Sequence, residues 1–331
     1  MNNAYKRTFL TIAFLLSVST LYFAQQIETG TPTARRSGIH SGNQVKTVFS
    51  NSAVIAQPGD LHYRGAWKFR RNGYVGDVSP LVGVRLPIQD YNEDSQNDTI
   101  VSVVITSVSR PGGGDFSPGG GTFLGFEPIP GFFNPEFDEV GKGVAMSHQP
   151  ETWPSVWPDE PSWIDEDGNA EWNGFFGRDQ FNADQESYWW MDDNADDKMF
   201  DRYGYIPDAN NPDRRGQALQ FTGRGLQWSN FLAQDVVFWL YEISNTGTEL
   251  YDQTVFGTLV GTYVGADGDE WNDDVSFFDI REAITYTWDF DNNIRPSANP
   301  AWLPNPDEVG YIAYAFLESP GNPFDGIDND G

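Results

Sequence analysis

Short runs of β-branched and aromatic residues, bounded by turn-forming residues, recur along most of this chain. Glycine occurs 34 times and proline 21 times, so turns can form throughout. Few windows show apolar residues at the three-to-four spacing of an amphipathic helix. This pattern is typical of antiparallel strands joined by short connections. The sequence therefore predicts a mainly β fold, namely an antiparallel β-sandwich.

The strand signals fall into two groups, one before residue 110 and a stronger one after Gln220. The segments expected to form strands are Gln44–Phe49, Ala53–Ala56, a part of Tyr74–Ile88 around Leu81–Leu86, Thr99–Ser109, Asp235–Ser244, Gln253–Val264, Ile284–Trp288 and Gly310–Leu317.

Two of these segments, Asp235–Ser244 and Gln253–Val264, flank a turn-rich connection, and we expect them to pair as a hairpin. Val237, Trp239, Tyr241 and Ile243 share one face of the first strand, and its other face is also apolar. A strand with two apolar faces is typical of a central position that is covered on both sides.

Residues 111–217 differ from the rest of the chain in composition. Tryptophan, proline, aspartate and asparagine follow one another there without hydrophobic periodicity. A long structureless stretch is uncommon inside a compact domain, and its aromatic content argues against simple disorder. We expect a long irregular excursion that packs against the sandwich. Its tryptophans favour a small core of their own, and sugar-stacking surfaces are the alternative. The set comprises Trp153, Trp157, Trp163, Trp172, Trp189 and Trp190.

The N-terminus has the features of a secretory signal. Lys6 and Arg7 precede a short apolar run from Phe9 to Phe23, and Ala24 follows it. We expect cleavage after Ala24, with an uncleaved anchor as the alternative. The predicted organisation is a signal peptide at 1–24, a lead at 25–60, a β-sandwich domain at 61–318 with the excursion at about 111–217, and the start of an Asp-rich calcium-binding region at 319–331.

Cysteine is absent and the formal net charge is −28. The first fact excludes disulfides, thiolate metal sites and a cysteine nucleophile. The second disfavours binding to nucleic acid and to anionic membranes, and it favours divalent cations. For a secreted chain, these facts predict stability from a large core or from bound metal.

Five segments place aspartate or asparagine at alternate positions, often beside glycine. This spacing lets a tight turn bring several oxygens toward one calcium ion, although none of the segments matches a complete EF-hand loop. Turn-forming sequences without metal give the same pattern. The candidate ligands are Asp165, Asp167, Asn169 and Glu171; Asp192, Asn194 and Asp196; Asp267 and Asp269; Asp289, Asp291 and Asn293; and Asp325, Asp328 and Asp330. Calcium is the expected cofactor.

Catalytic patterns are weak. The three histidines, His40, His62 and His148, lack metal-ligand spacing, and no nucleophile elbow, phosphate-binding loop or dinucleotide fingerprint occurs. With 48 acidic residues, a carboxylate pair for glycoside hydrolysis cannot be picked out by eye. No catalytic residue is predicted.

Several segments resemble the N-terminal region of large secreted proteins of Bacteroidetes-type bacteria, which often end in a type IX secretion sorting domain. The resemblance rests on Tyr74–Gly83 (YVGDVSPLVG), Phe181–Tyr188 with Met191–Asp193, Ala233–Gly247 (AQDVVFWLYEISNTG) and Phe316–Gly331. The last segment also resembles thrombospondin type 3 calcium repeats. The resemblance implies secretion and carries no catalytic residues.

The sequence thus predicts a secreted, calcium-stabilised extracellular or cell-surface protein with a structural or binding role. Two alternatives remain open, a carbohydrate-active module that binds or hydrolyses glycans, and the N-terminal part of a secreted peptidase. A carbohydrate or surface partner is expected, and nucleic acid is not.

Overall fold

A computed structural model describes residues 28–57, 63–68, 73–88, 98–105, 125–264, 274–290 and 310–318. These residues form a mainly β structure with one short α-helix, α2 (Lys198–Tyr203), and two 3-10 turns, η1 (Pro32–Ala34) and η3 (Pro150–Thr152). The strands are β1 (Ser37–His40), β2 (Val45–Ser50), β3 (Ala66–Trp67), β4 (Val75–Ile88), β5 (Asp98–Ile105), β6 (Glu127–Pro128), β7 (Ala145–Met146), β8 (Asn173–Gly174), β9 (Gly177–Arg178), β10 (Gln185–Asp192), β11 (Leu219–Gln227), β12 (Phe238–Asn245), β13 (Thr254–Thr262), β14 (Asp274–Asp279), β15 (Ile284–Asp289) and β16 (Tyr311–Ala315).

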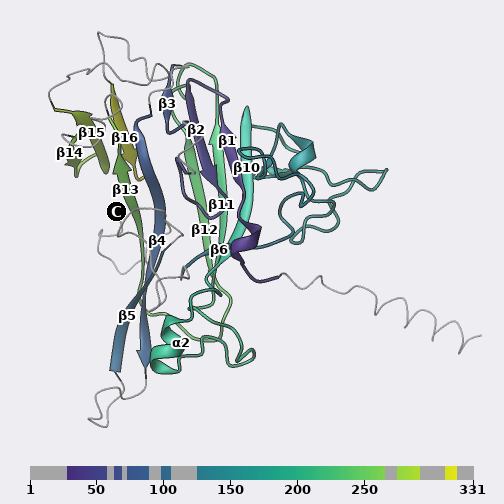
Figure 1. Ribbon diagram of the computed structural model, residues 1–331, viewed down its shortest axis with the longest axis vertical. Coiled ribbons are helices and arrows are strands. Elements are labelled where there is room, and N and C mark those ends of the chain that lie inside the picture. The colour runs from purple at the N-terminus through teal and green to yellow at the C-terminus, as the bar shows by residue number, and fades with distance from the viewer. Residues whose placement is uncertain are drawn as a thin grey trace, which may run out of the picture.

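Two antiparallel sheets face each other and confirm the predicted β-sandwich (Figure 1). One sheet contains β13–β4–β5, and Ile55 bridges it to β2 by pairing with both Phe49 and Val78. The other runs β12–β11–β10–β6, with β7 also on β10. The segment predicted as a lead, 25–60, thus contributes β1, β2 and Ile55 to the sandwich. The predicted strand Ala53–Ala56 forms only these isolated bridges.

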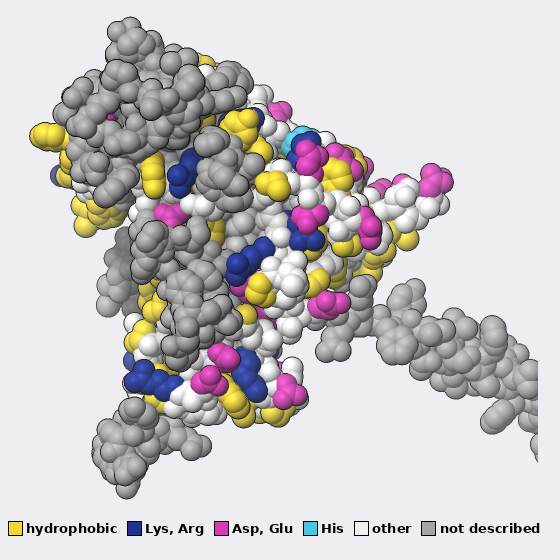
Figure 2. Space-filling view, in the orientation of Figure 1, with side chains coloured by type: hydrophobic (Ala, Val, Ile, Leu, Met, Phe, Trp, Pro, Cys, Tyr) yellow, Lys and Arg dark blue, Asp and Glu magenta, His cyan; other side chains and the backbone are white. Residues whose placement is uncertain are grey.

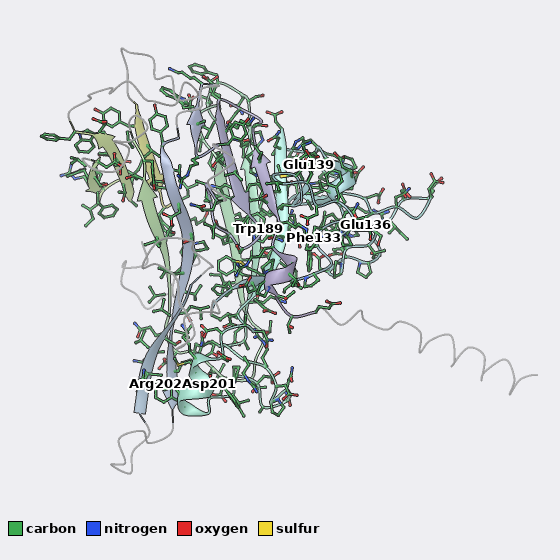
Figure 3. The ribbon with its side chains drawn as sticks, viewed as in Figure 1. Phe133, Glu136, Glu139, Trp189, Asp201 and Arg202 are labelled. Atoms are coloured by element: carbon green, nitrogen blue, oxygen red, sulfur yellow. The ribbon has the colours of Figure 1, made fainter. Side chains whose placement is uncertain are left out.

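The main hydrophobic core lies between the two sheets. Val82, Leu86 and Val104 from one sheet meet Trp189 and Phe221 from the other. Figure 3 labels Trp189 near the centre of the molecule, and Asp201 and Arg202 on α2 at its lower end. Burial of this many apolar side chains is the main source of stability expected for a chain without disulfides.

A third layer covers the outer face of the second sheet. Residues 129–184, apart from β7, pack there around a second core that includes Phe132, Trp157, Trp172 and Tyr188. Figure 3 labels Phe133, Glu136 and Glu139 in this layer, beyond β10. The predicted excursion exists as a packed layer, but the prediction of an irregular segment was wrong for Gln185–Asp192. That segment is β10, a strand inside the second sheet.

The predicted hairpin of Asp235–Ser244 with Gln253–Val264 is wrong. β12 pairs with β11, whereas β13 pairs with β4 in the opposite sheet. The connection between them therefore crosses from one sheet to the other. β12 is the last strand of its sheet among the described residues and is only half-buried, so it is not the central, doubly covered strand that its two apolar faces suggested. Trp239, Tyr241 and Ile243, which were expected to share one face of the strand, pack against the main core.

A small sheet of β14, β15 and β16 packs beside β4 and β13. Ile312 and Tyr314 of β16 contact a third cluster formed by Ile55, Val75 and Val78. β15 and β16 confirm the strands expected at Ile284–Trp288 and Gly310–Leu317. Figure 2 shows hydrophobic side chains gathered on the outer side of this small sheet, where Phe277 and Phe278 of β14 are exposed.

The predicted signal peptide at 1–24 and the Asp-rich end at 319–331 lie outside the described residues, and both stay predictions. In the part of the chain that the structure describes, no helix has the length and apolarity needed to span a bilayer.

Candidate functional site

The Asp165–Glu171 segment is a self-contained turn in which the predicted calcium ligands bond to one another. One carboxylate oxygen of Asp165 accepts the backbone N–H groups of Asp167 (2.9 Å) and Asn169 (2.8 Å), and the other accepts the Asn169 side chain (3.1 Å). These hydrogen bonds hold the pKa of Asp165 below its usual range, with Asn169 as the main cause. Glu171 pairs with Arg178 instead of facing Asp165. The exposed loop therefore uses its lead carboxylate to close a turn.

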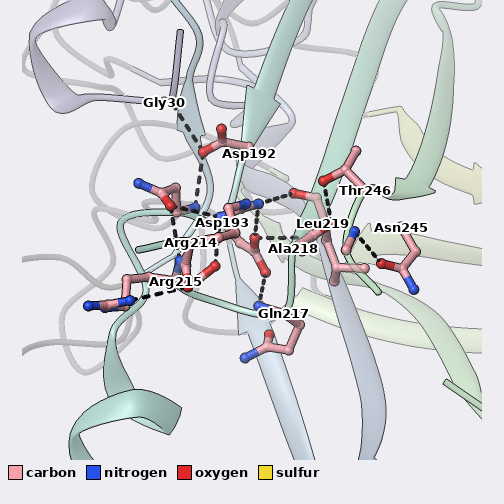
Figure 4. A network of polar contacts seen from close by, with 12 residues as sticks. Gly30, Asp192, Asp193, Arg214, Arg215, Gln217, Ala218, Leu219, Asn245 and Thr246 are labelled. Atoms are coloured by element: carbon pink, nitrogen blue, oxygen red, sulfur yellow. Dashed lines mark hydrogen bonds and ion pairs between the residues drawn. The ribbon is translucent and has the colours of Figure 1, made fainter. Parts of the chain in front are cut away.

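The second candidate set, Asp192, Asn194 and Asp196, lies where β10 ends (Figure 4). Oδ1 of Asp192 accepts the backbone N–H groups of Gly30 (3.1 Å) and Asn194 (3.0 Å), while Asn194 accepts from the Arg214 side chain (3.1 Å). Asp196 forms an ion pair with Lys198 at 3.2 Å. The three side chains thus bind different partners and do not converge on one point.

The central residue of this region is Asp193, which sequence reasoning passed over. Its carboxylate accepts from the Arg214 guanidinium (2.7 Å) and from the backbone N–H groups of Gln217 (2.6 Å) and Leu219 (3.0 Å) (Figure 4). Burial raises the pKa of Asp193 to about 7, and the neighbouring Arg214 charge acts in the opposite direction. The network ties the end of β10 to the start of β11.

The remaining candidates give no metal centre that can be described. Asp289 is buried on β15 opposite Asp274 of β14, and Asp274 accepts from the Thr262 hydroxyl at 2.5 Å. Asp267, Asp269, Asp291, Asn293, Asp325, Asp328 and Asp330 lie outside the described residues. Within the described ranges, no group of three or more histidine, aspartate or glutamate side chains is arranged to hold a metal ion.

The tryptophans form packing cores, as their favoured interpretation predicted. Trp157 and Trp172 are fully buried in the second core, and Trp189 is buried in the main core. Indole N–H groups of the outer layer bind inside the protein, for example Trp157 to the Glu171 carbonyl at 2.6 Å and Trp153 to the Met146 carbonyl at 2.7 Å. These rings are therefore not the exposed sugar-stacking surface considered as the alternative.

His40 lies 3.0 Å from the hydroxyl of Ser187, but this pair cannot act on a substrate. Both side chains are fully buried, and the His40 ring packs against Phe49 and Trp239. Burial lowers the pKa of His40 to about 3, so the imidazole is neutral in the folded protein. His148 bonds to Gln185 at the surface of the same region, and His62 lies outside the described residues.

A buried ion pair fixes an exposed aromatic hairpin in the outer layer. Arg224 of β11 pairs with Glu186 of β10, and both side chains are nearly excluded from solvent. Arg224 also donates to the backbone and side-chain oxygens of Asn173 (2.6 and 3.1 Å), and Glu186 accepts the N–H of Phe175 (2.9 Å). The ion pair therefore holds the β8–β9 hairpin at two residues, Asn173 and Phe175, on either side of Gly174.

The tip of that hairpin displays two phenylalanines. Phe175 and Phe176 are 45% and 56% exposed, and their rings meet edge to face with centroids 4.9 Å apart. Gly177 follows with a φ of +123°, a backbone conformation that only glycine adopts readily. The glycine at this position therefore favours the turn. Arg178, Asp179 and Gln180 beside it are exposed and polar. The hairpin thus combines a fixed backbone, apolar rings and hydrogen-bonding groups. It is the described feature best suited to contact a ligand.

The hairpin was not predicted from sequence, because nothing in Asn173–Arg178 marks its partners 11 and 51 residues away along the chain. Comparison of the chain with protein-family models, with curated proteins and with solved structures found no match.

Proposed function

We propose that this chain is a secreted, extracellular or cell-surface protein with a binding role, and that it recognises its ligand through the β8–β9 hairpin. The observation that carries the proposal is the buried Glu186–Arg224 pair, whose two side chains bond directly to the backbone at Asn173 and Phe175. The N-terminal signal pattern and the resemblance to secreted proteins support the location.

The Glu186–Arg224 pair places two charges in the protein interior. Removing two charges from water costs several kcal/mol per ion before their attraction is counted, so such a pair is weak evidence for stability alone. Here it fixes a hairpin whose tip leaves Phe175 and Phe176 in water. Exposed aromatic groups on a rigid support lose little conformational entropy on binding, which favours recognition.

The ligand class that the tip favours is a polysaccharide. Flat apolar rings can stack on the apolar faces of sugars, and the exposed Arg178, Asp179 and Gln180 can donate to or accept from hydroxyl groups. The binding module supported here differs from the predicted alternative in its residues, because it uses phenylalanines in place of the buried tryptophans.

Affinity gel electrophoresis with soluble polysaccharides, including xyloglucan, mixed-linkage β-glucan, galactomannan and pectin, tests this function. We expect at least one of them to retard the protein, and the double variant F175S/F176S to migrate without retardation. Phe277→Ser is the matched control, because Phe277 is 53% exposed on β14, outside the outer layer. If no polysaccharide retards the wild type, the ligand class is wrong. If the double variant is retarded equally, the site is wrong.

Calcium stabilisation remains part of the proposal. It is supported by the net charge of −28 and by the alternating acidic residues in segments outside the described residues. The described loops at 165–171 and 192–196 make hydrogen bonds that shape turns without requiring an ion, so we assign calcium no geometry there.

A further inference from the structure

The loop between β11 and β12, residues 228–237, carries the most exposed apolar pair among the described residues. Phe231 and Leu232 are adjacent and are 83% and 90% exposed. Isolated exposed hydrophobic residues are common, but two consecutive large ones at the tip of a loop are typical of a contact surface.

This loop is held in place by buried polar side chains. The amide nitrogen of Asn43 lies within hydrogen-bond distance of the carbonyl oxygens of Val236 (2.8 Å), Ala233 (3.1 Å) and Trp228 (3.3 Å). Gln227 in turn donates to the Asn43 side-chain oxygen at 2.9 Å. Asn43 thus holds the loop by hydrogen bonds to three of its carbonyl groups. The backbone that carries the exposed Phe231 and Leu232 is therefore fixed.

Within the loop, a local turn brings the two apolar residues to its tip. The side-chain oxygen of Asn230 accepts the Leu232 N–H at 3.1 Å, and the Asn230 carbonyl accepts the Ala233 N–H at 3.0 Å. Both bonds are typical of an asparagine-led turn. The exposure of the pair therefore results from defined geometry and not from fraying.

Indole and ammonium groups surround the base of this loop. The Trp228 N–H binds the Asn182 carbonyl, and the Trp67 N–H binds Asp235, each at 2.7 Å. The Lys68 ammonium lies 3.8 Å from the centre of the Trp67 ring. Gln44 joins the two segments, because its N–H binds the Gln234 carbonyl and its carbonyl accepts the Lys68 N–H. Apolar residues with nearby tryptophan and lysine are the pattern found at membrane interfaces.

Charges of both signs lie at the base of this loop among the described residues. The exposed carboxylates of Asp184 and Asp235 accept from the Ser229 N–H and the Trp67 indole, and the Lys68 ammonium lies over the Trp67 ring. Lys68 therefore supplies a positive charge beside an interfacial aromatic ring, where it can meet a lipid phosphate.

We propose that this end of the sandwich docks on a lipid bilayer that contains anionic phospholipid. Phe231 and Leu232 enter the outer acyl layer, Trp67 and Trp228 lie at the level of the headgroups, and Lys68 contacts lipid phosphate. A contact of this size is reversible, since two apolar side chains bury less hydrocarbon than a single lipid anchor. It would bring the outer layer, which Trp228 contacts at the Asn182 carbonyl, toward a membrane surface.

Vesicle sedimentation tests the proposal with the chain from Gln25 onward, because the apolar run at 9–23 would itself bind lipid. Wild type, F231S/L232S and Leu250→Ser are mixed with vesicles of phosphatidylcholine alone and of phosphatidylcholine with 30% phosphatidylglycerol. Leu250 is the matched control, since it is 87% exposed and lies in the loop at the opposite end of β12.

We expect wild type and Leu250→Ser to bind equally to the mixed vesicles at millimolar lipid. The partition coefficient of F231S/L232S should be lower by a factor of about ten or more. Lys68→Glu should weaken binding to the mixed vesicles more than to pure phosphatidylcholine. The proposal would be overturned if the wild type sedimented with neither kind of vesicle, or if F231S/L232S bound the mixed vesicles as well as the wild type does.

Analytical ultracentrifugation without lipid provides the other decisive result. If wild type self-associates and F231S/L232S does not, the loop binds a second copy and the lipid assignment is wrong.

Discussion

The guanidinium of Arg214 donates to the carboxylate of Asp193 across 2.7 Å, with both side chains almost entirely shielded from solvent. The same carboxylate accepts the backbone N–H groups of Gln217 and Leu219, which begin the path into β11. One acidic side chain therefore satisfies three donors that have no access to bulk water. Its importance is structural, and it lies in a segment that the sequence suggested for calcium.

Asp193→Ala should destabilise the protein by about 3–5 kcal/mol, because it leaves the buried charge of Arg214 and two backbone N–H groups without their acceptor. Urea unfolding followed by tryptophan fluorescence measures this change. Asp213→Ala is the control, since Asp213 is exposed in the turn that precedes Arg214, and its effect should stay within about 0.5 kcal/mol. Similar midpoints for the two variants would show that the network is not needed for stability.

Gly223→Ala should destabilise the fold by at least about 1–3 kcal/mol. A Cβ at this position of β11 would overlap the indole ring of Trp189 on β10. Gly83→Ala, on β4, is the matched strand substitution. The nearest atom to its added Cβ lies 3.8 Å away, so that variant should be neutral or slightly more stable. Thermal unfolding of both variants is the measurement. Equal loss of stability in the two would contradict close packing of Trp189 against β11.

The buried His40 should make the protein less stable as pH falls. Burial lowers its pKa from 6.5 to about 3, so the folded state excludes a proton that the unfolded state takes up below about pH 6.5. The free energy of unfolding should therefore decrease between about pH 6.5 and pH 3, at a rate of up to about 1.4 kcal/mol per pH unit from this group. Above pH 6.5 the contribution is constant.

His40→Gln isolates this effect, because glutamine does not titrate. Its unfolding free energy should fall less steeply than that of the wild type between pH 6 and pH 4, even if its stability at pH 7 is lower. His148→Gln serves as a comparison at an exposed position. Parallel curves for wild type and His40→Gln would mean that His40 accepts a proton in the folded state.

Calcium should raise the thermal midpoint of the chain relative to EDTA, since an ion that binds only the folded state stabilises it by mass action. Asp165→Ala separates the two interpretations of the exposed loop at 165–171. If the Asp165 carboxylate only closes the turn, the substitution lowers the midpoint equally with EDTA and with millimolar calcium. A loss seen only with calcium would place an ion in that loop, and identical wild-type midpoints in both buffers would remove calcium from the proposal.

The sequence predicted the fold class and most strand positions, but it could not predict the pairing. β12 and β13 follow one another, and hydrophobic pattern alone does not distinguish a hairpin from a connection that crosses between two sheets. β10 escaped detection for a related reason. Tyr188 and Trp189 face opposite sides of this strand, and both are buried, so the alternation that marks a half-exposed strand is absent.

The candidate site was harder to predict, because its parts come from distant places. Asn43 holds a loop near residue 233, and Arg224 holds a hairpin at Asn173. Such contacts have no local sequence signature. The alternating aspartates did mark real turns at 165–169 and 192–196, but turn closure and calcium binding use the same residues at the same spacing.

β10 lies between two cores, with Trp189 in one and Tyr188 in the other. The outer layer therefore cannot detach without uncovering the far side of a sheet, and the two cores should melt as one cooperative unit. The arrangement also has a mechanical consequence. Glu186 lies on β10 itself, so a force on a ligand bound at the hairpin would pass directly to the strand that both cores share.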